Sequence, residues 1–342
     1  MSEATAPVVA PVPRSMLAPL RFIARQRELS LVLVMLLLGA FVAVQAPQLL
    51  SRSNLVQVSV LASIIAIAAV GEAIVVITRN VDLSVESTIG LVAFVVADLL
   101  ASRTLSEPVG IAAGLGLGVV LGMGNGILVG ALRVPSIVAT LGTLSIYRGL
   151  LLLFAGGKQV TVTDLPEGYT ALARADLVGI PVFVVIAVAI VAIAAIVLRQ
   201  TRGGRYVYAV GSNPEAASII GIRAGLVMFA AFTACGLLGG VAGVLWGLEF
   251  GTVNASSATG VTLQVIAAVV VGGVAIFGGS GTVVGAGLGA LFLAFISNAL
   301  ILLRLSQFWL QAIYGIVILL AVLLDAALLR RLQRSTSRRR GQ

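Results

Sequence analysis

The chain contains long, predominantly apolar runs without a charged residue, such as 29–44 and 182–198, separated by short stretches rich in glycine, proline and charge. A helix needs roughly 20 apolar residues to cross about 30 Å of hydrocarbon, and it satisfies its own backbone polar groups. The pattern therefore predicts an all-α polytopic membrane bundle of about ten transmembrane helices. The predicted spans cover residues 29–46, 55–78, 83–101, 109–131, 134–155, 180–199, 225–247, 262–278, 282–303 and 308–328.

Composition agrees with this interpretation. Of the 342 residues, 59% are hydrophobic and only 10% are charged, whereas soluble domains carry about 25% charged residues. The mean hydropathy is +1.13. The net charge of +9 comes mainly from arginines that lie beside the spans and near the two termini. Because that placement is typical of a topology signal, we expect a lipid environment and no nucleic-acid partner.

The basic residues predict the orientation. If the chain starts inside, ten spans leave 16 of the 22 basic residues in cytoplasmic segments and 5 outside, with Arg148 within a span. Cytoplasmic loops carry the excess of Lys and Arg, so both termini are expected in the cytoplasm. The predicted organisation is a cytoplasmic N-terminal tail (1–28), a transmembrane domain (29–328) and a basic cytoplasmic C-terminal tail (329–342). The first span is expected to be uncleaved, because the basic stretch before it is too long for a signal peptide.

One cytoplasmic connection, residues 200–224, is long enough to hold a helix of its own. Asn213 suits an N-cap, Pro214 suits the first helical position, and Glu215 suits the positive end of the helix dipole. Gly221 can end the helix. The sequence therefore predicts a short capped helix between the sixth and seventh spans.

Several kinds of chemistry are absent. The chain has no histidine, which excludes zinc-protease sites and histidine-assisted serine nucleophiles. The only lysine, Lys158, is followed by Gln159, so no phosphate-binding loop of the G-x-x-x-x-G-K-[ST] type exists. The single cysteine, Cys235, cannot form an intrachain disulfide. We expect no catalytic residues, no metal site and no cofactor in this chain, which is not an enzyme.

Charged side chains within the spans are the first functional candidates, because they are costly in lipid and face the bundle interior or a cavity. Glu72 lies deep in the second span, where a path-facing role and a structural role are both open. Asp82, Glu86 and Asp98 lie near span ends, which favours helix–helix hydrogen bonds or a wet interfacial position. Arg148 lies in the second half of the fifth span, where it either snorkels outward or forms an internal ion pair.

Three uncharged polar residues also lie within spans. For Asn125, Gln264 and Asn298 the favoured role is hydrogen bonding between helices, with contact to a polar solute as the second interpretation. The candidate translocation-path residues are Glu72, Asp82, Glu86, Asn125, Gln264 and Asn298.

Four strings, in this order along the chain, resemble the permease subunits of bacterial carbohydrate ABC importers, the ribose, arabinose and xylose group. They are TRNVDLSV at 78–85, VPSIVATLGT at 134–143, YAVGSNPEAA at 208–217 and the glycine-rich segment at 266–281. Residues 78–80, 139–149 and 156–158 are most similar to the rhamnose and autoinducer-2 permeases. One departure is Glu86, where the family usually has glycine after Leu-Ser-Val.

The resemblance implies a multi-pass protein of the bacterial cytoplasmic membrane that imports a small sugar. Its implied partners are a second permease subunit, same or paralogous, a cytoplasmic ABC ATPase that binds ATP and Mg, and an extracytoplasmic sugar-binding protein. The implied ATPase-coupling residues are Asn213, Pro214, Glu215, Ala216, Ala217 and Gly221.

Two other function classes stay open at this point. An ion-coupled secondary transporter of a small polar solute needs a deeply buried ion site, for which Glu72 is the candidate. An intramembrane enzyme needs a nucleophile–base pair or two deep aspartates, and the sequence offers neither. The sugar also stays open between rhamnose, autoinducer-2 and a pentose.

Overall fold

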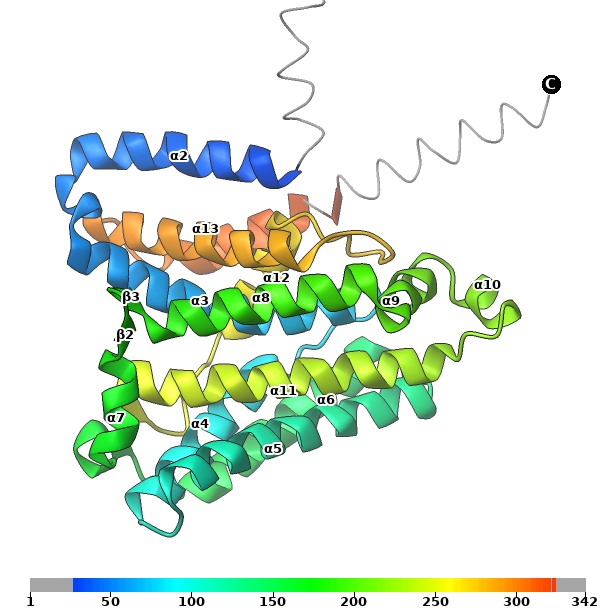
Figure 1. The fold of residues 1–342 in the computed structure, drawn as a ribbon, viewed down its shortest axis with the longest axis horizontal. Coiled ribbons are helices and arrows are strands. Elements are labelled where there is room, and N and C mark those ends of the chain that lie inside the picture. The colour runs from blue at the N-terminus through cyan, green and yellow to red at the C-terminus, as the bar shows by residue number, and fades with distance from the viewer. Residues whose placement is uncertain (1–26, 321, 324–342) are drawn as a thin grey trace, which may run out of the picture.

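The computed structural model describes residues 27–320, 322 and 323 (Figure 1). The predicted C-terminal tail and nearly all of the predicted N-terminal tail lie outside these residues. The long helices lie roughly along one common direction (Figure 1), as in a membrane bundle. They are α2 (Arg27–Gln45), α3 (Arg52–Ile77), α4 (Val85–Ala101), α5 (Glu107–Gly126), α6 (Ser136–Ala155), α7 (Glu167–Arg174), α8 (Val182–Gln200), α9 (Arg202–Ser212), α10 (Pro214–Ile219), α11 (Ala224–Phe250), α12 (Val261–Val271), α13 (Val283–Leu302) and an unlabelled helix at Trp309–Leu320.

The predicted all-α membrane fold is confirmed. Within the described residues, seven helices are long and apolar enough to cross a membrane. The 17-residue α4 and two shorter apolar helices, α12 and Trp309–Leu320, lie at the remaining predicted spans. The orientation of the termini stays a prediction.

The predicted span 262–278 is wrong in its length. Only its first part is helical, because α12 has 11 residues and ends at Val271. Gly273, Gly278 and Gly279 follow with φ between 74° and 83°, a left-handed conformation that glycine adopts without steric cost. The rest of the segment is therefore a non-helical connection to α13.

The core is organised around α3. Residues 62–77 of this helix are buried except for the half-buried Ile74, and the helix contacts α8, α11, α12 and α13. Peripheral helices such as α2 and α8 expose leucine, valine and isoleucine side chains instead. An apolar exterior around a buried central helix is the arrangement that a lipid environment favours, since hydrocarbon gives no penalty to exposed apolar side chains.

α5 and α11 pack against each other through close backbone contacts. Glycines from both helices bring the two backbones together, and a Cβ added at Gly122 would lie 2.8 Å from Gly236 Cα. Small residues allow this approach, and dispersion contacts between the backbones then hold the pair together. α5 continues into a π-helical turn at Ile127–Ala131 that also packs against α11.

The two ends of the bundle differ. The end with α9 and α10 lies opposite the end with α7, β2 (Asp176–Leu177) and β3 (Ile180–Pro181) (Figure 1). At the α7 end, β1 (Val160–Thr161) pairs with β4 (Thr252–Val253), which follows α11. Tyr169 of α7 is fully buried, and its hydroxyl donates a 3.0 Å hydrogen bond to Val244 O. The long connection 156–179 is thus folded onto the bundle.

Candidate functional site

The predicted short cytoplasmic helix is present as α10. Asn213 is its N-cap, with its side-chain oxygen accepting a 3.0 Å hydrogen bond from the backbone N–H of Ala216. Pro214 and Glu215 occupy the first turn, and Ala217 is buried. Gly221 has φ +85° just beyond the end of the helix. The local sequence thus folds as expected, whereas the role of α10 toward an ATPase stays a prediction.

The preceding helix, α9, was missed by sequence reasoning. Thr201 caps it by accepting a 3.0 Å hydrogen bond from Gly204 N, a start signal that the sequence does contain. Gly211, near its end, lies so close to Ile77 O that no side chain fits there. The backbone N–H of Gly279 donates to the same Ile77 oxygen at 2.9 Å. α9, the end of α3 and the connection after α12 therefore meet at one point.

α10 borders a groove of about 1180 Å³. The groove is also lined by the π-helical turn Ile127–Ala131, by residues 133–136 up to the start of α6, and by the start of α11. Arg133 and Arg223 line it together with Glu215. Beside the groove, Ile219 and Ile220 at the end of α10 are 85% and 74% exposed. These two adjacent isoleucines form a small exposed apolar surface at the end of α10.

Three of the six path candidates form one buried cluster. Asp82 N donates to Glu72 Oε1 at 3.1 Å, because the chain after α3 turns back along that helix. Asn125 of α5 donates from Nδ2 to both Asp82 oxygens at 3.2 and 3.3 Å and to Ser84 Oγ at 2.8 Å. Glu72, Asp82 and Asn125 are all buried. The expectation of a wet position for Asp82 is therefore wrong, and its hydrogen-bonded role is observed.

This cluster ties α3, α4 and α5 together. Ser84 donates from both N and Oγ to Asp82 Oδ1, at 2.9 and 2.6 Å. Among the described residues, Asn125 Oδ1 has no hydrogen-bond partner. The thiol of Cys235 lies 4.0 Å from Glu72 Oε2. With every carboxylate oxygen of Asp82 occupied by donors, the arrangement is that of a structural network.

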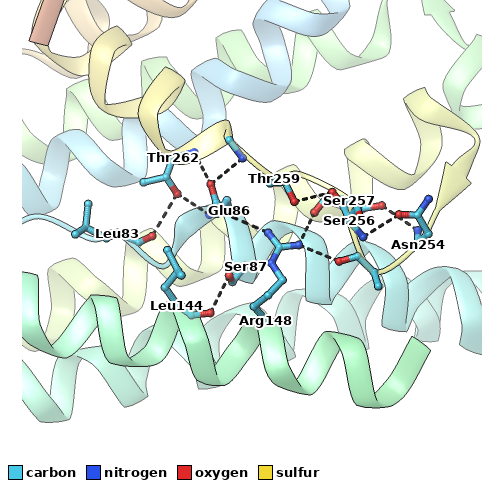
Figure 2. A network of polar contacts seen from close by, with 12 residues as sticks. Leu83, Glu86, Ser87, Leu144, Arg148, Asn254, Ser256, Ser257, Thr259 and Thr262 are labelled. Carbon is cyan, nitrogen blue, oxygen red and sulfur yellow. Dashed lines mark hydrogen bonds and ion pairs between the residues drawn. The ribbon is translucent and has the colours of Figure 1, made fainter. Parts of the chain in front are cut away.

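Glu86 belongs to a second, separate network, in which it joins three helices (Figure 2). From the first turn of α4, its Oε2 accepts from Gly260 N at 2.9 Å and from Thr262 N at 3.4 Å, and so it caps α12. The Glu86 backbone N–H donates in return to Thr262 Oγ1 at 3.1 Å. A carboxylate at a helix N-terminus satisfies backbone donors and the positive dipole end together.

Arg148 of α6 completes this network. Its Nη2 lies 3.5 Å from Glu86 Oε1, and its Nη1 donates to Ala255 O at 3.2 Å and to Ser257 O at 3.0 Å (Figure 2). The side chains of Arg148 and Glu86 are 18% and 15% exposed. Of the two roles open for Arg148 from sequence, the internal ion pair is the one observed.

The remaining candidates lie apart from both networks. Asn298 of α13 and Asn54 of α3 exchange two side-chain hydrogen bonds of 2.8 and 3.1 Å, the interhelical role favoured from sequence. Gln264 is half-buried on α12. Asp98 lines a pocket of about 310 Å³ whose other lining residues, from α4, α5 and α6, are apolar. Within the described part of the chain, no three His, Cys, Asp or Glu residues gather in a way that could hold a metal ion.

Comparison with known proteins adds an independent finding. Residues 54–322 match the family model described as branched-chain amino acid transport system / permease component. The chain is 38% identical over 321 residues to the autoinducer 2 import system permease protein LsrC of Salmonella typhi, covering 94% of this chain and 92% of the relative. It is 37% identical to the proteins of the same name from Escherichia coli (strain K12 / DH10B) and Shigella flexneri, covering 94% of this chain and 93% of each. No solved structure matches.

Proposed function

Because the chain belongs to the permease-component family of ABC import systems, we propose that it forms the membrane path for a small polyhydroxylated solute and is driven by a separate ATPase. The resemblance inferred from four strings of the sequence is thereby confirmed at the level of the family, as is a multi-pass inner-membrane protein. The solute class, autoinducer-2, rhamnose or a pentose, rests on the names of the relatives and on the sequence resemblance.

The observation that carries the proposal is α10 at one end of the bundle. A capped helix with exposed Ile219 and Ile220 offers a rigid apolar contact for a cytoplasmic partner. α10 is followed directly by the 27-residue α11, which contacts α3, α4 and α5. A displacement of α10 by a bound partner would therefore move α11 and the helices packed against it as a rigid body.

ATP and Mg belong to the partner ATPase in this proposal. The described face around α10 supplies a groove with Arg133, Arg223 and Glu215, which suits a protein surface of mixed charge. The opposite end, with α7 and the β1–β4 pair, is the proposed contact for an extracytoplasmic binding protein. A second permease subunit would complete the path.

An ion-coupled transporter is the alternative, and the buried Glu72–Asp82 cluster is the observation that favours it. Such a transporter holds its coupling ion on buried polar groups near the middle of the membrane. ATP depletion and collapse of the ion gradient separate the two functions. Uptake into vesicles that survives ATP depletion and stops without the gradient would refute the ABC function.

The direct test perturbs α10. We expect Glu215→Arg, or deletion of residues 213–217, to abolish co-purification of the ATPase with the permease and to abolish ATP-driven uptake. Asn213→Ala removes the cap, at a cost of about 1 kcal/mol to the helix, and should weaken both. Asn213→Ser keeps a capping oxygen and is the matched control that should retain both. ATPase binding and uptake that persist in the deletion variant would refute the coupling role.

A further inference from the structure

The Glu86–Arg148 pair lies near the middle of the membrane. At 1.5 Å per residue, Arg148 is about 18 Å along α6 from its first residue, Ser136. α12, whose first residues Glu86 caps, has 11 residues and spans about 16 Å, roughly half of the ~30 Å hydrocarbon thickness. Both helices place the ion pair at mid-depth, where a charge persists only beside an opposite charge, the bundle interior or a cavity.

The backbone beside this pair is not helical. Between β4 and α12, residues 254–260 pack against the middle of α4: a Cβ added at Gly90 would lie 2.7 Å from Ser257 O. Two side chains of this segment, Ser256 and Thr259, are exposed. Irregular backbone at membrane depth is tolerated only where protein buries it or where it lines a water-filled cavity. An exposed hydroxyl-bearing segment at this depth therefore does not face lipid.

Gly142, Ser145 and Gly149 form a stripe of small residues along the neighbouring face of α6. Gly142 and Ser145 are exposed, and a Cβ added at Gly142 or Gly149 would meet no atom within 4 Å. Ile146 and Leu153 follow Gly142 and Gly149 by four residues, so they lie beside the stripe, where they are 59% and 79% exposed. Arg148 follows Ser145 by three residues and lies at the edge of the same stripe.

We propose that residues 254–260 and the Gly142–Ser145–Gly149 face of α6 line the translocation path at mid-membrane, with the Glu86–Arg148 pair as its polar wall. This proposal rests on the transport function proposed above and specifies where the solute passes. The pair carries no net charge, and the segment beside it presents hydroxyls and carbonyls. Such a wall exchanges hydrogen bonds with the hydroxyls of an uncharged polyol and gives no advantage to an ion.

Arg148 holds this segment in place. Its Nη1 donates to Ala255 O and Ser257 O, and its Nη2 is buried at ion-pair distance from Glu86. The hydroxyls and carbonyls of residues 254–260 are therefore the part of the wall that a passing hydroxyl meets.

Cysteine accessibility tests the lining. In a Cys235→Ala background, which removes the only native thiol, Ser256→Cys and Thr259→Cys are made singly. The permease is assembled with its ATPase and binding protein in membrane vesicles and treated with a cationic, membrane-impermeant methanethiosulfonate. Ile193→Cys, on the exposed face of the peripheral helix α8, is the lipid-facing control. Thr163→Cys, on the exposed connection after β1, is the water-facing control.

We expect Ser256→Cys and Thr259→Cys to react at least about tenfold faster than Ile193→Cys, and their modification to block ATP-driven uptake. Reaction no faster than that of Ile193→Cys overturns the proposal. The proposal is also overturned if the cysteines react in the isolated chain but not in the assembled complex, because the segment is then a subunit interface. It is overturned as well if modification leaves uptake unchanged. Absence of ATP-driven uptake by the unmodified complex refutes the transport function instead, so the two failures are distinguishable.

Discussion

The contact between α5 and α11 predicts that a glycine-to-alanine substitution in α5 changes the stability of the protein in a direction that depends on which glycine is replaced. A Cβ added at Gly122 would lie 2.8 Å from Gly236 Cα and 3.0 Å from Gly236 N, whereas ordinary van der Waals contact begins near 3.4 Å. The obstacle is backbone, which cannot rotate away as a side chain does. Gly122→Ala therefore forces the two helices apart by about 0.6 Å or more, enough to forfeit roughly a quarter of each dispersion contact along the interface.

Overpacking of this kind should lower the free energy of unfolding of Gly122→Ala by about 1–3 kcal/mol. Gly116 lies on the same helix with nothing within 4 Å of its added Cβ. Gly116→Ala should be neutral or stabilising by up to ~1 kcal/mol, because alanine loses less conformational freedom than glycine in a helix. We expect the free energies of unfolding of the two alanine variants to differ by about 1–4 kcal/mol. Gly122→Ala should be less stable than the native chain, and Gly116→Ala should be as stable or more stable.

The buried thiol of Cys235 supplies the assay, because it becomes reactive only when the bundle opens. The detergent-purified protein is heated with a fluorogenic thiol reagent, and the midpoint of reaction is compared between variants. Size-exclusion chromatography after heating gives a second readout that does not involve the thiol. Equal midpoints for Gly122→Ala and Gly116→Ala would refute the backbone contact between α5 and α11.

Three other contacts give shorter predictions. Glu86→Leu leaves Arg148 without its counter-ion and should lower stability by at most about 3–5 kcal/mol; the double variant with Arg148→Leu should recover part of this loss, and equal losses in single and double variants would contradict the ion pair. Asn298→Leu removes the reciprocal amide pair and should cost about 0.6–1.7 kcal/mol in thermal unfolding, as interhelical hydrogen bonds in membranes do; no change would show that Asn54 finds another partner. Gly211→Ala should separate α9 from the end of α3 and lower uptake per ATP hydrolysed, and unchanged coupling would exclude this junction as a route of movement.

Local signals explain what the sequence predicts well. Hydropathy locates nearly every span, because a membrane helix must be apolar along its whole length. α10 is recognisable since its cap, its proline and its acidic first turn lie within three consecutive residues, 213–215. Both signals are contained within a single segment of the chain.

The predictions that were wrong concern features that depend on contacts between segments far apart in the sequence. The apolar run at 262–278 has the composition of a full span, yet its glycines end α12 at Val271 and leave a connection that packs on α3 and α9. Asp82 lies near a span end in sequence, but the chain turns back so that its N–H reaches Glu72. In each case the outcome depends on a contact with a distant segment, which hydropathy does not encode.

Glu86 shows how a single departure from a family pattern can be explained by its contacts. Glycine at this position, as the resemblance leads one to expect, would leave Arg148 without a counter-ion and the N–H groups of Gly260 and Thr262 without their side-chain acceptor. Since an unpaired charge at mid-membrane is costly, Glu86 and Arg148 are expected to function as a unit. A chain with glycine at 86 would then need either a neutral residue at 148 or another acid nearby. The acid is therefore part of how this chain holds α12 against α4 and α6, and it fixes the polar wall that the solute is proposed to pass.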